Sequence, residues 1–192
     1  MPVVSEAEPR RYRSGMRTRA AILDAVRQLL ADNGLEGTTI AAICAKADIS
    51  AGSFYNLFAS KEAAVLTVVR EAIEAIDPHG SDSSLDALLD AYVRFIVDEE
   101  TLARVYLLMA VSGGLTDATL GSRFVNHHRQ RIQLFCAAIV REAPDLTDDE
   151  VLDRAEALLA ALNGYAFQWM LDPSFDLKGH AARLLEVHKL QR

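Results

Sequence analysis

The stretch from Thr38 to Lys61 constrains the fold of this chain more than any other part of the sequence. Its first half carries apolar residues at the spacing of one helix face: Ile40, Ile43, Cys44 and Ala47. Thr39 precedes them and is suited to cap the first turn, because its hydroxyl can accept a bond from an unpaired backbone N–H. The segment Ala47–Ser50 then interrupts the helix, since Asp48 tolerates the left-handed backbone that ends a helix. The sequence therefore predicts one short helix that stops at a tight turn.

A second short helix is predicted directly after this turn, over Ala51–Phe58. Ser50 is suited to cap its start, and Phe54 and Phe58 lie four residues apart, so they face the same way and anchor the helix to a core. Two short helices joined by a tight turn form a helix-turn-helix, whose second helix enters the major groove of DNA.

The rest of the chain shows helical periodicity, no strand-like alternation and no internal repeat. Further helices are predicted over residues 18–33, 61–76, 85–97, 101–111, 117–142, 148–171 and 176–190. Thr147 with Glu150 forms a predicted capping box, and Pro144 and Pro173 stop the helices before them. A chain of 192 residues with 51% hydrophobic content is long enough for a sizeable core, so we predict an all-α fold.

Residues 17–66 as a whole resemble the N-terminal DNA-binding domain of TetR-family transcriptional regulators. The resemblance rests on Arg17, Asn33-Gly34, Thr38-Thr39, Ile43, Ala47 to Tyr55, Phe58 and Ser60-Lys61-Glu62. Two residues depart from the family pattern: Asp48 stands where the family usually has Gly, and Leu57 stands where it often has His. The second departure removes a polar DNA contact that many relatives have. The close likeness covers about a quarter of the chain, and the remainder resembles the family only as a helical segment of the expected length.

The resemblance implies an N-terminal three-helix helix-turn-helix domain followed by a larger C-terminal helical domain for ligand binding and dimerisation. We expect a flexible basic arm over 1–15, the DNA-binding domain over 16–61, and the effector-binding and dimerisation domain over 62–192. The implied function is a ligand-responsive regulator, which we expect to be a repressor, that binds a near-palindromic operator as a homodimer. A small, lipophilic effector is expected to release it.

The net charge of −7 argues at first against a nucleic-acid partner. Residues 1–61, however, hold 8 Lys or Arg against 6 Asp or Glu, a balance of +2, whereas residues 62–192 hold 12 against 21, a balance of −9. Five arginines gather just before the helix-turn-helix: Arg10, Arg11, Arg13, Arg17 and Arg19. A local basic patch can bind phosphate on an acidic protein, so the charge distribution is compatible with DNA binding.

Candidate DNA contacts follow from side-chain chemistry. Arg17, Thr39, Lys46, Tyr55 and Lys61 suit backbone phosphates, and in the family a Tyr and a Lys at the last two positions commonly do this. The residues expected to face base edges are Ser50, Ala51, Gly52, Ser53 and Asn56. None of them can make the bidentate arginine–guanine contact. We therefore expect recognition of the base sequence to depend on apolar contacts to thymine and on DNA shape. The alternative is that Ser50 merely caps its helix and Asn56 faces water.

The C-terminal helices carry the residues expected at an effector pocket: Tyr92, Phe95, Tyr106, Met109, Phe124, His128, Phe135 and Trp169. The alternative is that these residues only pack in the hydrophobic core, and only the family resemblance favours a pocket. The last two helices also carry more apolar surface than one subunit needs, which predicts a four-helix dimer interface. Its expected residues are Leu158, Leu162, Tyr165, Leu184, Leu185 and His188, and the alternative again is core.

Other functional classes find little support in the sequence. No nucleophile elbow, phosphate loop or metal-binding His pair is present, so neither an enzyme nor a metal or cofactor site is predicted. No run of about 18 apolar residues predicts a membrane-spanning helix, and residues 1–15 lack the apolar core of a secretory signal. Cys44 and Cys136 lie far apart, which favours a reducing cytoplasm and leaves a thiol sensor as an alternative. The main rival keeps the fold without the regulation: a helical dimer that binds DNA poorly or needs no ligand.

Overall fold

The structure, a computed structural model, describes residues 7–78, 84–116 and 118–190, and all regular secondary structure in these ranges is α-helical. The helices are α1 (Ala7–Gly37), α2 (Ile40–Ala47), α3 (Ala51–Tyr55), α4 (Lys61–Ile76), α5 (Leu85–Asp98), α6 (Glu100–Thr116), α7 (Ala118–Glu142), α8 (Asp148–Leu171) and α9 (Leu177–Leu190). The chain divides into two compact units between Glu71 and Ala72, within α4. The all-α prediction is confirmed.

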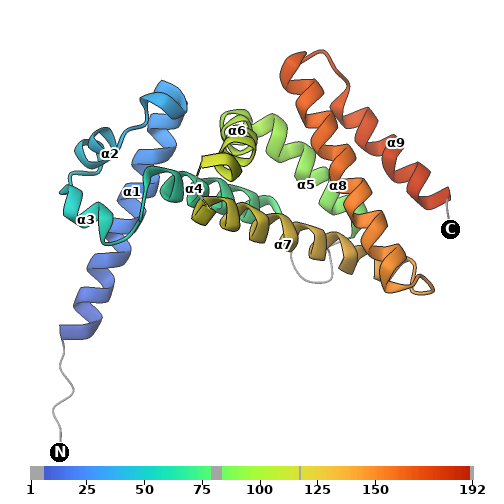
Figure 1. The fold of residues 1–192 in the computed structure, drawn as a ribbon, viewed down its shortest axis with the longest axis horizontal. Helices are drawn as coiled ribbons and strands as arrows, with labels where there is room; N and C mark the ends of the chain where they lie inside the picture. Colours follow the sequence, from blue (N-terminus) through green and yellow to red (C-terminus); the bar gives the residue numbers. More distant parts are fainter. Residues whose placement is uncertain (1–6, 79–83, 117, 191–192) are drawn as a thin grey trace, which may run out of the picture. The chain divides into compact units, whose positions relative to one another are not determined.

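The first unit is built on α1, against which α2 lies, with α3 following α2 after a short turn (Figure 1). Gly34 has a left-handed backbone (φ 66°) and kinks the end of α1, which a side chain with a Cβ adopts only at a cost. The hydroxyl of the buried Thr38 donates to the Gly34 carbonyl at 2.7 Å and so satisfies the broken helix end. The core includes the fully buried Ile22, Val26, Ile43, Phe54, Val65 and Val68.

Three helix boundaries differ from the sequence prediction. α1 begins at Ala7 rather than near Thr18, since Pro9 falls in the first turn, where proline does not interrupt helical hydrogen bonding. α3 ends at Tyr55 rather than Phe58. α6 continues to Thr116 through Gly113-Gly114, where the sequence predicts a break; glycine weakens a helix by about 1 kcal/mol but does not forbid it.

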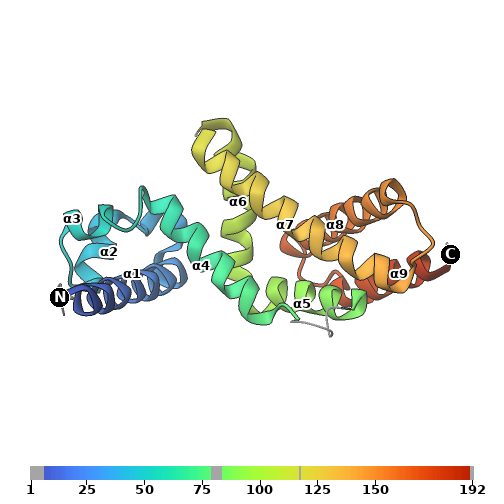
Figure 2. The same cartoon turned by 90° about the horizontal axis from the view of Figure 1, so that it is seen from below.

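In the second unit, α7 packs against both α6 and α8, and α5 contacts α6, α7, α8 and α9. Figures 1 and 2 show α8 and α9 as an antiparallel pair joined by a short loop. The predicted capping box is present: Thr147 accepts from the Glu150 backbone N–H, and the Glu150 carboxylate accepts from the Thr147 N–H at 2.9 Å. The core centres on Leu85, Leu88, Phe135, Ile139 and Leu162. Within the described ranges, every helix is too short or too polar to cross a membrane.

Candidate functional site

The turn between α2 and α3 is held by capping interactions at both ends. Thr39 accepts a hydrogen bond from the Ala42 N–H at 3.1 Å and starts α2. Asp48 ends it with a left-handed backbone (φ 53°) and donates its N–H to the Cys44 carbonyl. Ser50 accepts from the Ser53 N–H at 3.1 Å and starts α3. The helix-turn-helix is therefore formed as predicted, and Asp48 takes the left-handed position where glycine is usual.

One side of α3 is buried, and this determines which of its residues are exposed on the opposite side. Phe54 is fully buried and packs on Phe58, with ring centroids 5.9 Å apart. Four residues are exposed as a result, namely Ala51, Gly52, Tyr55 and Asn56, and 57% of Tyr55 is accessible. Ser50 and Ser53 share a hydroxyl hydrogen bond of 3.0 Å, so Ser50 does act as a cap. The exposed surface of α3 is small and uncharged, with one tyrosine at its edge.

The residues predicted to contact phosphates are partly gathered in space. Thr39, Tyr55 and Lys61 line one shallow hollow. The Lys61 ammonium donates to the Leu35 carbonyl at 3.0 Å and lies 4.0 Å from the Glu62 carboxylate. An ammonium has three donors, so this one supports the kinked end of α1 and still has hydrogens for an anion.

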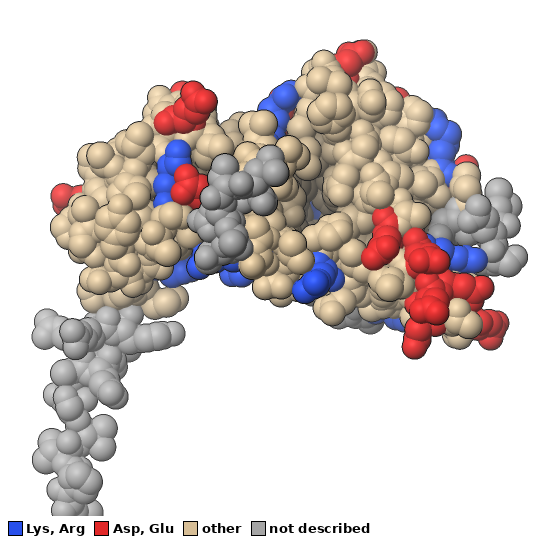
Figure 3. All heavy atoms as spheres, in the orientation of Figure 1, with Lys and Arg blue, Asp and Glu red and all other residues tan. Residues whose placement is uncertain are grey.

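Two further predicted phosphate contacts lie outside this hollow. The side chain of Arg17 on α1 is exposed, and the Lys46 ammonium lies 3.7 Å from Asp32. Arg19 has a partner within the first unit: its guanidinium donates to Glu71 on α4 at 2.8 Å. In the second unit, the acidic residues Asp145, Asp148, Asp149 and Glu150 are exposed around the start of α8, where acidic side chains gather on the face drawn in Figure 3.

A cavity of about 430 Å³ lies within the second unit. It is lined from the last turn of α4 and from α5, α6, α7 and α8. Five of the eight predicted pocket residues line it: Tyr92, Phe95, Tyr106, Phe124 and His128. Met109 and Phe135 are buried but are not part of the lining, and neither is the half-buried Trp169. The volume falls in the range of roughly 300–1,000 Å³ that is usual for small-molecule sites.

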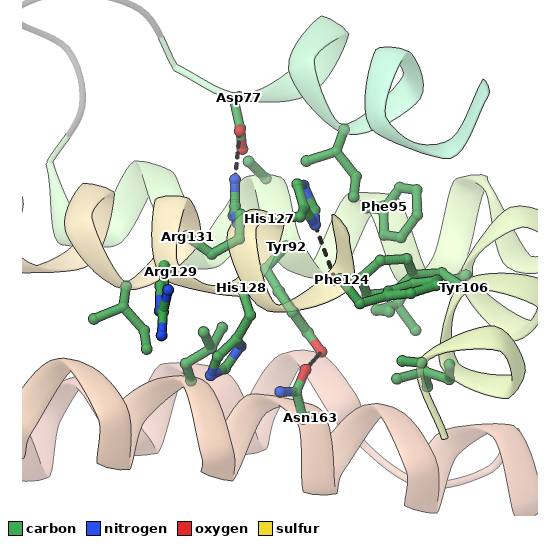
Figure 4. A pocket seen from close by; sticks show the side chains of 18 of the residues that line it. Asp77, Tyr92, Phe95, Tyr106, Phe124, His127, His128, Arg129, Arg131 and Asn163 are labelled. Carbon is green, nitrogen blue, oxygen red and sulfur yellow. Dashed lines mark hydrogen bonds and ion pairs between the residues drawn. The ribbon is translucent and has the colours of Figure 1, made fainter. Parts of the chain in front are cut away.

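Three polar pairs stand among the apolar lining residues, and Figure 4 marks each with a dashed line. The Tyr92 hydroxyl donates to the Asn163 side-chain oxygen at 2.8 Å. The Tyr106 hydroxyl and His127 Nδ1 lie 2.9 Å apart in a hydrogen bond. The Arg131 guanidinium forms an ion pair with the Asp77 carboxylate. Most of the polar lining groups are thus paired within the protein.

Burial changes the acidity of both cavity tyrosines. Loss of hydration raises the pKa of Tyr92 above its ordinary value and raises the pKa of Tyr106 to about 12, because a buried phenolate is poorly solvated. The positive charge of Arg131 opposes the rise in the pKa of both groups. Both phenols therefore act as neutral hydrogen-bonding groups at physiological pH.

Sequence reasoning missed four of the six residues in these pairs: Asp77, His127, Arg131 and Asn163. It selected His128, yet His127 is buried and His128 is exposed at the cavity rim. In Figure 4, Arg131 and His127 leave α7 on the side of Asp77, whereas His128 points toward α8. A signal was available, because steps of about four residues back from Phe135 lead to Arg131 and His127. No local signal marks Asp77 or Asn163.

The predicted dimer-interface residues are placed differently from expectation. Leu158, Leu162 and Leu185 are buried inside the second unit itself, so they belong to its core and are not free to face a partner. Leu184 is half-buried, Tyr165 packs on Phe175 and His180, and the side chain of His188 lies outside the described residues. The large apolar residues that are exposed in the described part of these two helices are Leu152, Phe167, Leu171 and Val187.

The remaining alternatives concern metals and thiols. The described ranges contain no cluster of three or more His, Cys, Asp or Glu suited to a metal ion. Cys44 is buried, and Cys136 is partly exposed. Desolvation raises the pKa of the Cys136 thiol, which disfavours the reactive thiolate form.

Comparisons with known proteins agree with this geometry. Residues 22–67 match the model of the family described as bacterial regulatory proteins, tetR family. The regulator UidR of Escherichia coli K12 is 27% identical over 137 residues, which cover 66% of this chain and 66% of UidR.

Solved structures share the fold along most of the chain. The fatty acid degradation regulator FadR from Bacillus halodurans has a TM-score of 0.65 and 17% identity, covering 88% of this chain and 96% of FadR. SmeT, the repressor of a Stenotrophomonas maltophilia multidrug efflux pump, has a TM-score of 0.64 and 20% identity in its triclosan complex, covering 88% of each chain. The matched helix-turn-helix, the UidR similarity and the shared helical fold lead to one conclusion: residues 22–67 are a tetR-family DNA-binding domain, and the chain as a whole is similar to the transcriptional regulators of that non-enzymatic family.

Proposed function

We propose that this regulator is a repressor that binds a near-palindromic operator as a homodimer and leaves it when a small effector fills the cavity of the second unit. The observation that carries the proposal is the capped helix-turn-helix, whose exposed α3 surface is free of bulky or charged side chains apart from Tyr55. A surface of this kind can approach the floor of the major groove closely. We place the protein in the cytoplasm, where its DNA lies.

The DNA contacts divide by chemistry. We assign Thr39, Tyr55 and Lys61 to one backbone phosphate, because they line the same hollow and supply hydroxyl and ammonium donors. Arg17 and Lys46 are assigned to flanking phosphates. At the groove, Ala51, Gly52 and Ser53 allow close approach, and the exposed Asn56 is the residue suited to adenine.

The dimer follows from the geometry of DNA. Two recognition helices reach successive major-groove sites on one face only if they lie about 34 Å apart, one helical turn. We propose that a second copy packs on the exposed side of α8, where Ala157, Ala160, Gly164, Phe167 and Leu171 are accessible. Small residues there let two helices approach closely, and the exposed Phe167 and Leu171 supply apolar area.

The effector proposal rests on the cavity. Its lining is mostly apolar with a few convergent polar groups, the usual form of a small-molecule site. SmeT has been solved in complex with triclosan; this chain shares its fold, and we propose a ligand of similar size. Such a ligand releases DNA only if it binds the free and operator-bound states with unequal affinity.

Selection from a library of short palindromic DNA duplexes tests the proposal. We expect enrichment of one near-palindromic sequence and an affinity that falls steeply as salt rises, because phosphate contacts release counterions. A folded protein that enriches no sequence would instead favour the rival, a helical dimer without regulatory DNA binding.

Gly52→Ala tests whether α3 lies close to the base edges of the operator. A Cβ at Gly52 meets only the Ser50 hydroxyl at 3.8 Å, an ordinary contact, so folding should be unaffected. If α3 lies against the base edges, the added methyl weakens operator binding by about tenfold or more. Tyr55→Phe should weaken binding less and equally for all sequences, because it removes one phosphate hydrogen bond. Unchanged affinity in both variants would contradict the assigned interface.

A further inference from the structure

We propose that the effector is an amphipathic monocarboxylate whose carboxylate replaces Asp77 on Arg131, while its apolar body occupies the cavity of the second unit. This inference rests on the proposed effector site and adds the chemical class of the ligand. It starts from a buried ion pair: the side chains of Arg131 and Asp77 are only 9% and 14% exposed.

The two partners of this pair differ in their freedom to move. Arg131 lies in the middle of α7, with helix on both sides and its guanidinium carbon 6.0 Å from the Phe135 ring centre. Asp77 directly follows the last residue of α4, Ile76, and is held there by its N–H bond to the Ile73 carbonyl at 2.9 Å. A small rotation at this helix end carries Asp77 toward water, whereas the backbone of Arg131 is held on both sides by α7.

This asymmetry selects the charge of the ligand. An unpaired buried charge costs several kcal/mol. A cationic ligand that captured Asp77 would leave Arg131 buried without a counter-ion. An anionic ligand that captures Arg131 leaves Asp77 free to become hydrated, so the exchange avoids an orphaned charge. An anion is therefore the ligand that this cavity accommodates at lower cost.

The two polar pairs beside Arg131 support a single anionic head rather than a polar ligand. Tyr92 is paired with Asn163, and Tyr106 with His127. Arg131, by contrast, uses Nη1 for Asp77, and a guanidinium has five N–H donors arranged to hold a carboxylate through two bonds. The positive charge of Arg131 also influences the pKa of both phenols, so its field reaches across the apolar part of the cavity.

The exchange acts on a helix that both units share. The Asp77 side chain binds the end of α4 to α7, and Arg94 donates to the Ile76 carbonyl there at 3.3 Å. α4 starts at Lys61, directly after the helix-turn-helix. Loss of the Arg131 pair thus removes a charged restraint from the helix that connects the cavity to the DNA-binding unit.

Calorimetric titration of the full chain with three probes of equal chain length tests the ligand class: decanoate, 1-decanol and decyltrimethylammonium. We expect decanoate to bind about tenfold or more tightly than decanol, because a charge-assisted bidentate contact is added, and the cation to bind more weakly than either. Equal affinity for decanoate and decanol, tighter binding of the cation, or no decanoate binding would each overturn the proposal.

Variants assign the effect to the pair. Asp77→Asn removes the competing carboxylate and should raise decanoate affinity several-fold, with decanol unchanged. Arg131→Gln combined with Asp77→Asn removes both charges, so no unpaired buried charge remains to destabilise the fold. This double variant should lose the preference for decanoate. Asp153→Asn, at an exposed carboxylate of α8 outside the lining, is the matched control and should change decanoate affinity less than twofold. A preference for decanoate that survives loss of Arg131 would contradict the assignment.

DNA binding is measured separately on the selected operator. If decanoate binds through Arg131 but does not release DNA, the ligand class stands and the repressor mechanism fails. If DNA is bound and decanoate is not, the repressor proposal stands and the carboxylate proposal fails.

Discussion

The helix-turn-helix and the cavity are stabilised by polar interactions of different range. In the helix-turn-helix, the caps at Thr39 and Ser50 each join residues three positions apart. Around the cavity, the pairs Tyr106–His127, Arg131–Asp77 and Tyr92–Asn163 join residues 21, 54 and 71 positions apart. Local caps form wherever the sequence places the right residue, but distant pairs exist only once several helices have packed.

Two ion pairs, one at Glu71 and one at Asp77, differ instead in their burial. Arg19–Glu71, in the first unit, is 34% and 36% exposed, whereas Arg131–Asp77, in the second, is far less so. An exposed pair contributes about 0–1 kcal/mol. A buried pair contributes little net stability but is costly to break by removing one partner. The cavity unit therefore carries a sensitivity that the DNA-binding unit lacks.

The largest expected effect lies in the core of the DNA-binding unit. Phe54→Ala removes a fully buried ring that packs on Phe58, and we expect a loss of about 3–5 kcal/mol in unfolding free energy. Urea unfolding followed by circular dichroism measures it, with Leu57→Ala, at an exposed residue, as control. If the two variants lose equal stability, α3 is not anchored as described.

Breaking the buried pair should give the next largest loss. Asp77→Ala leaves the buried Arg131 without its partner, and we expect a destabilisation of about 3 kcal/mol. Adding Arg131→Met should recover most of it, since no unpaired charge remains, whereas Glu71→Ala should cost no more than about 1 kcal/mol. A double variant as unstable as the single one would show that the unpaired charge of Arg131 is not responsible.

Tyr92→Phe tests a long-range hydrogen bond without a charge. The variant leaves the Asn163 oxygen, which accepts at 2.8 Å, without its donor, and we expect a loss of about 1–1.5 kcal/mol. The shift in urea midpoint at unchanged slope measures it. No loss would mean that water or another group replaces the hydroxyl.

Thr147→Ala tests a local cap within the cavity unit. It removes the hydroxyl that accepts from the Glu150 N–H at the start of α8, and we expect a loss of about 1 kcal/mol. Thr147→Ser keeps the hydroxyl and should retain most of the stability. If alanine and serine behave alike, the capping box does not contribute to the folded state.

Alkaline pH should give the most gradual effect. Burial raises the pKa of Tyr106 to about 12 from its ordinary value of 10.0, so the folded state holds this proton more tightly than the unfolded chain. Its stabilising contribution is complete below pH 10 and is lost as pH rises toward 12. Unfolding free energy measured between these values should fall less steeply in Tyr106→Phe, and an unchanged slope would contradict the pKa shift.

The sequence alone determined the parts of this protein whose interactions are local. Thr39, Asp48, Ser50 and the Phe54–Phe58 pair predicted the helix-turn-helix, and the same residues carried the family resemblance. Thr147 with Glu150 predicted the start of α8. In each case the partners lie within four residues, so the backbone geometry of one turn decides the contact.

Tertiary structure decided which helix faces are buried and which distant groups meet. A shift of one residue rotates a helix by about 100°, which is why His127 rather than His128 is buried. It is also why Leu158 and Leu162 pack in the core while Phe167 is exposed. The Arg131–Asp77 pair depends on the end of α4 meeting the middle of α7. No periodicity in either segment specifies that encounter, because it arises only from the packing of the complete second unit.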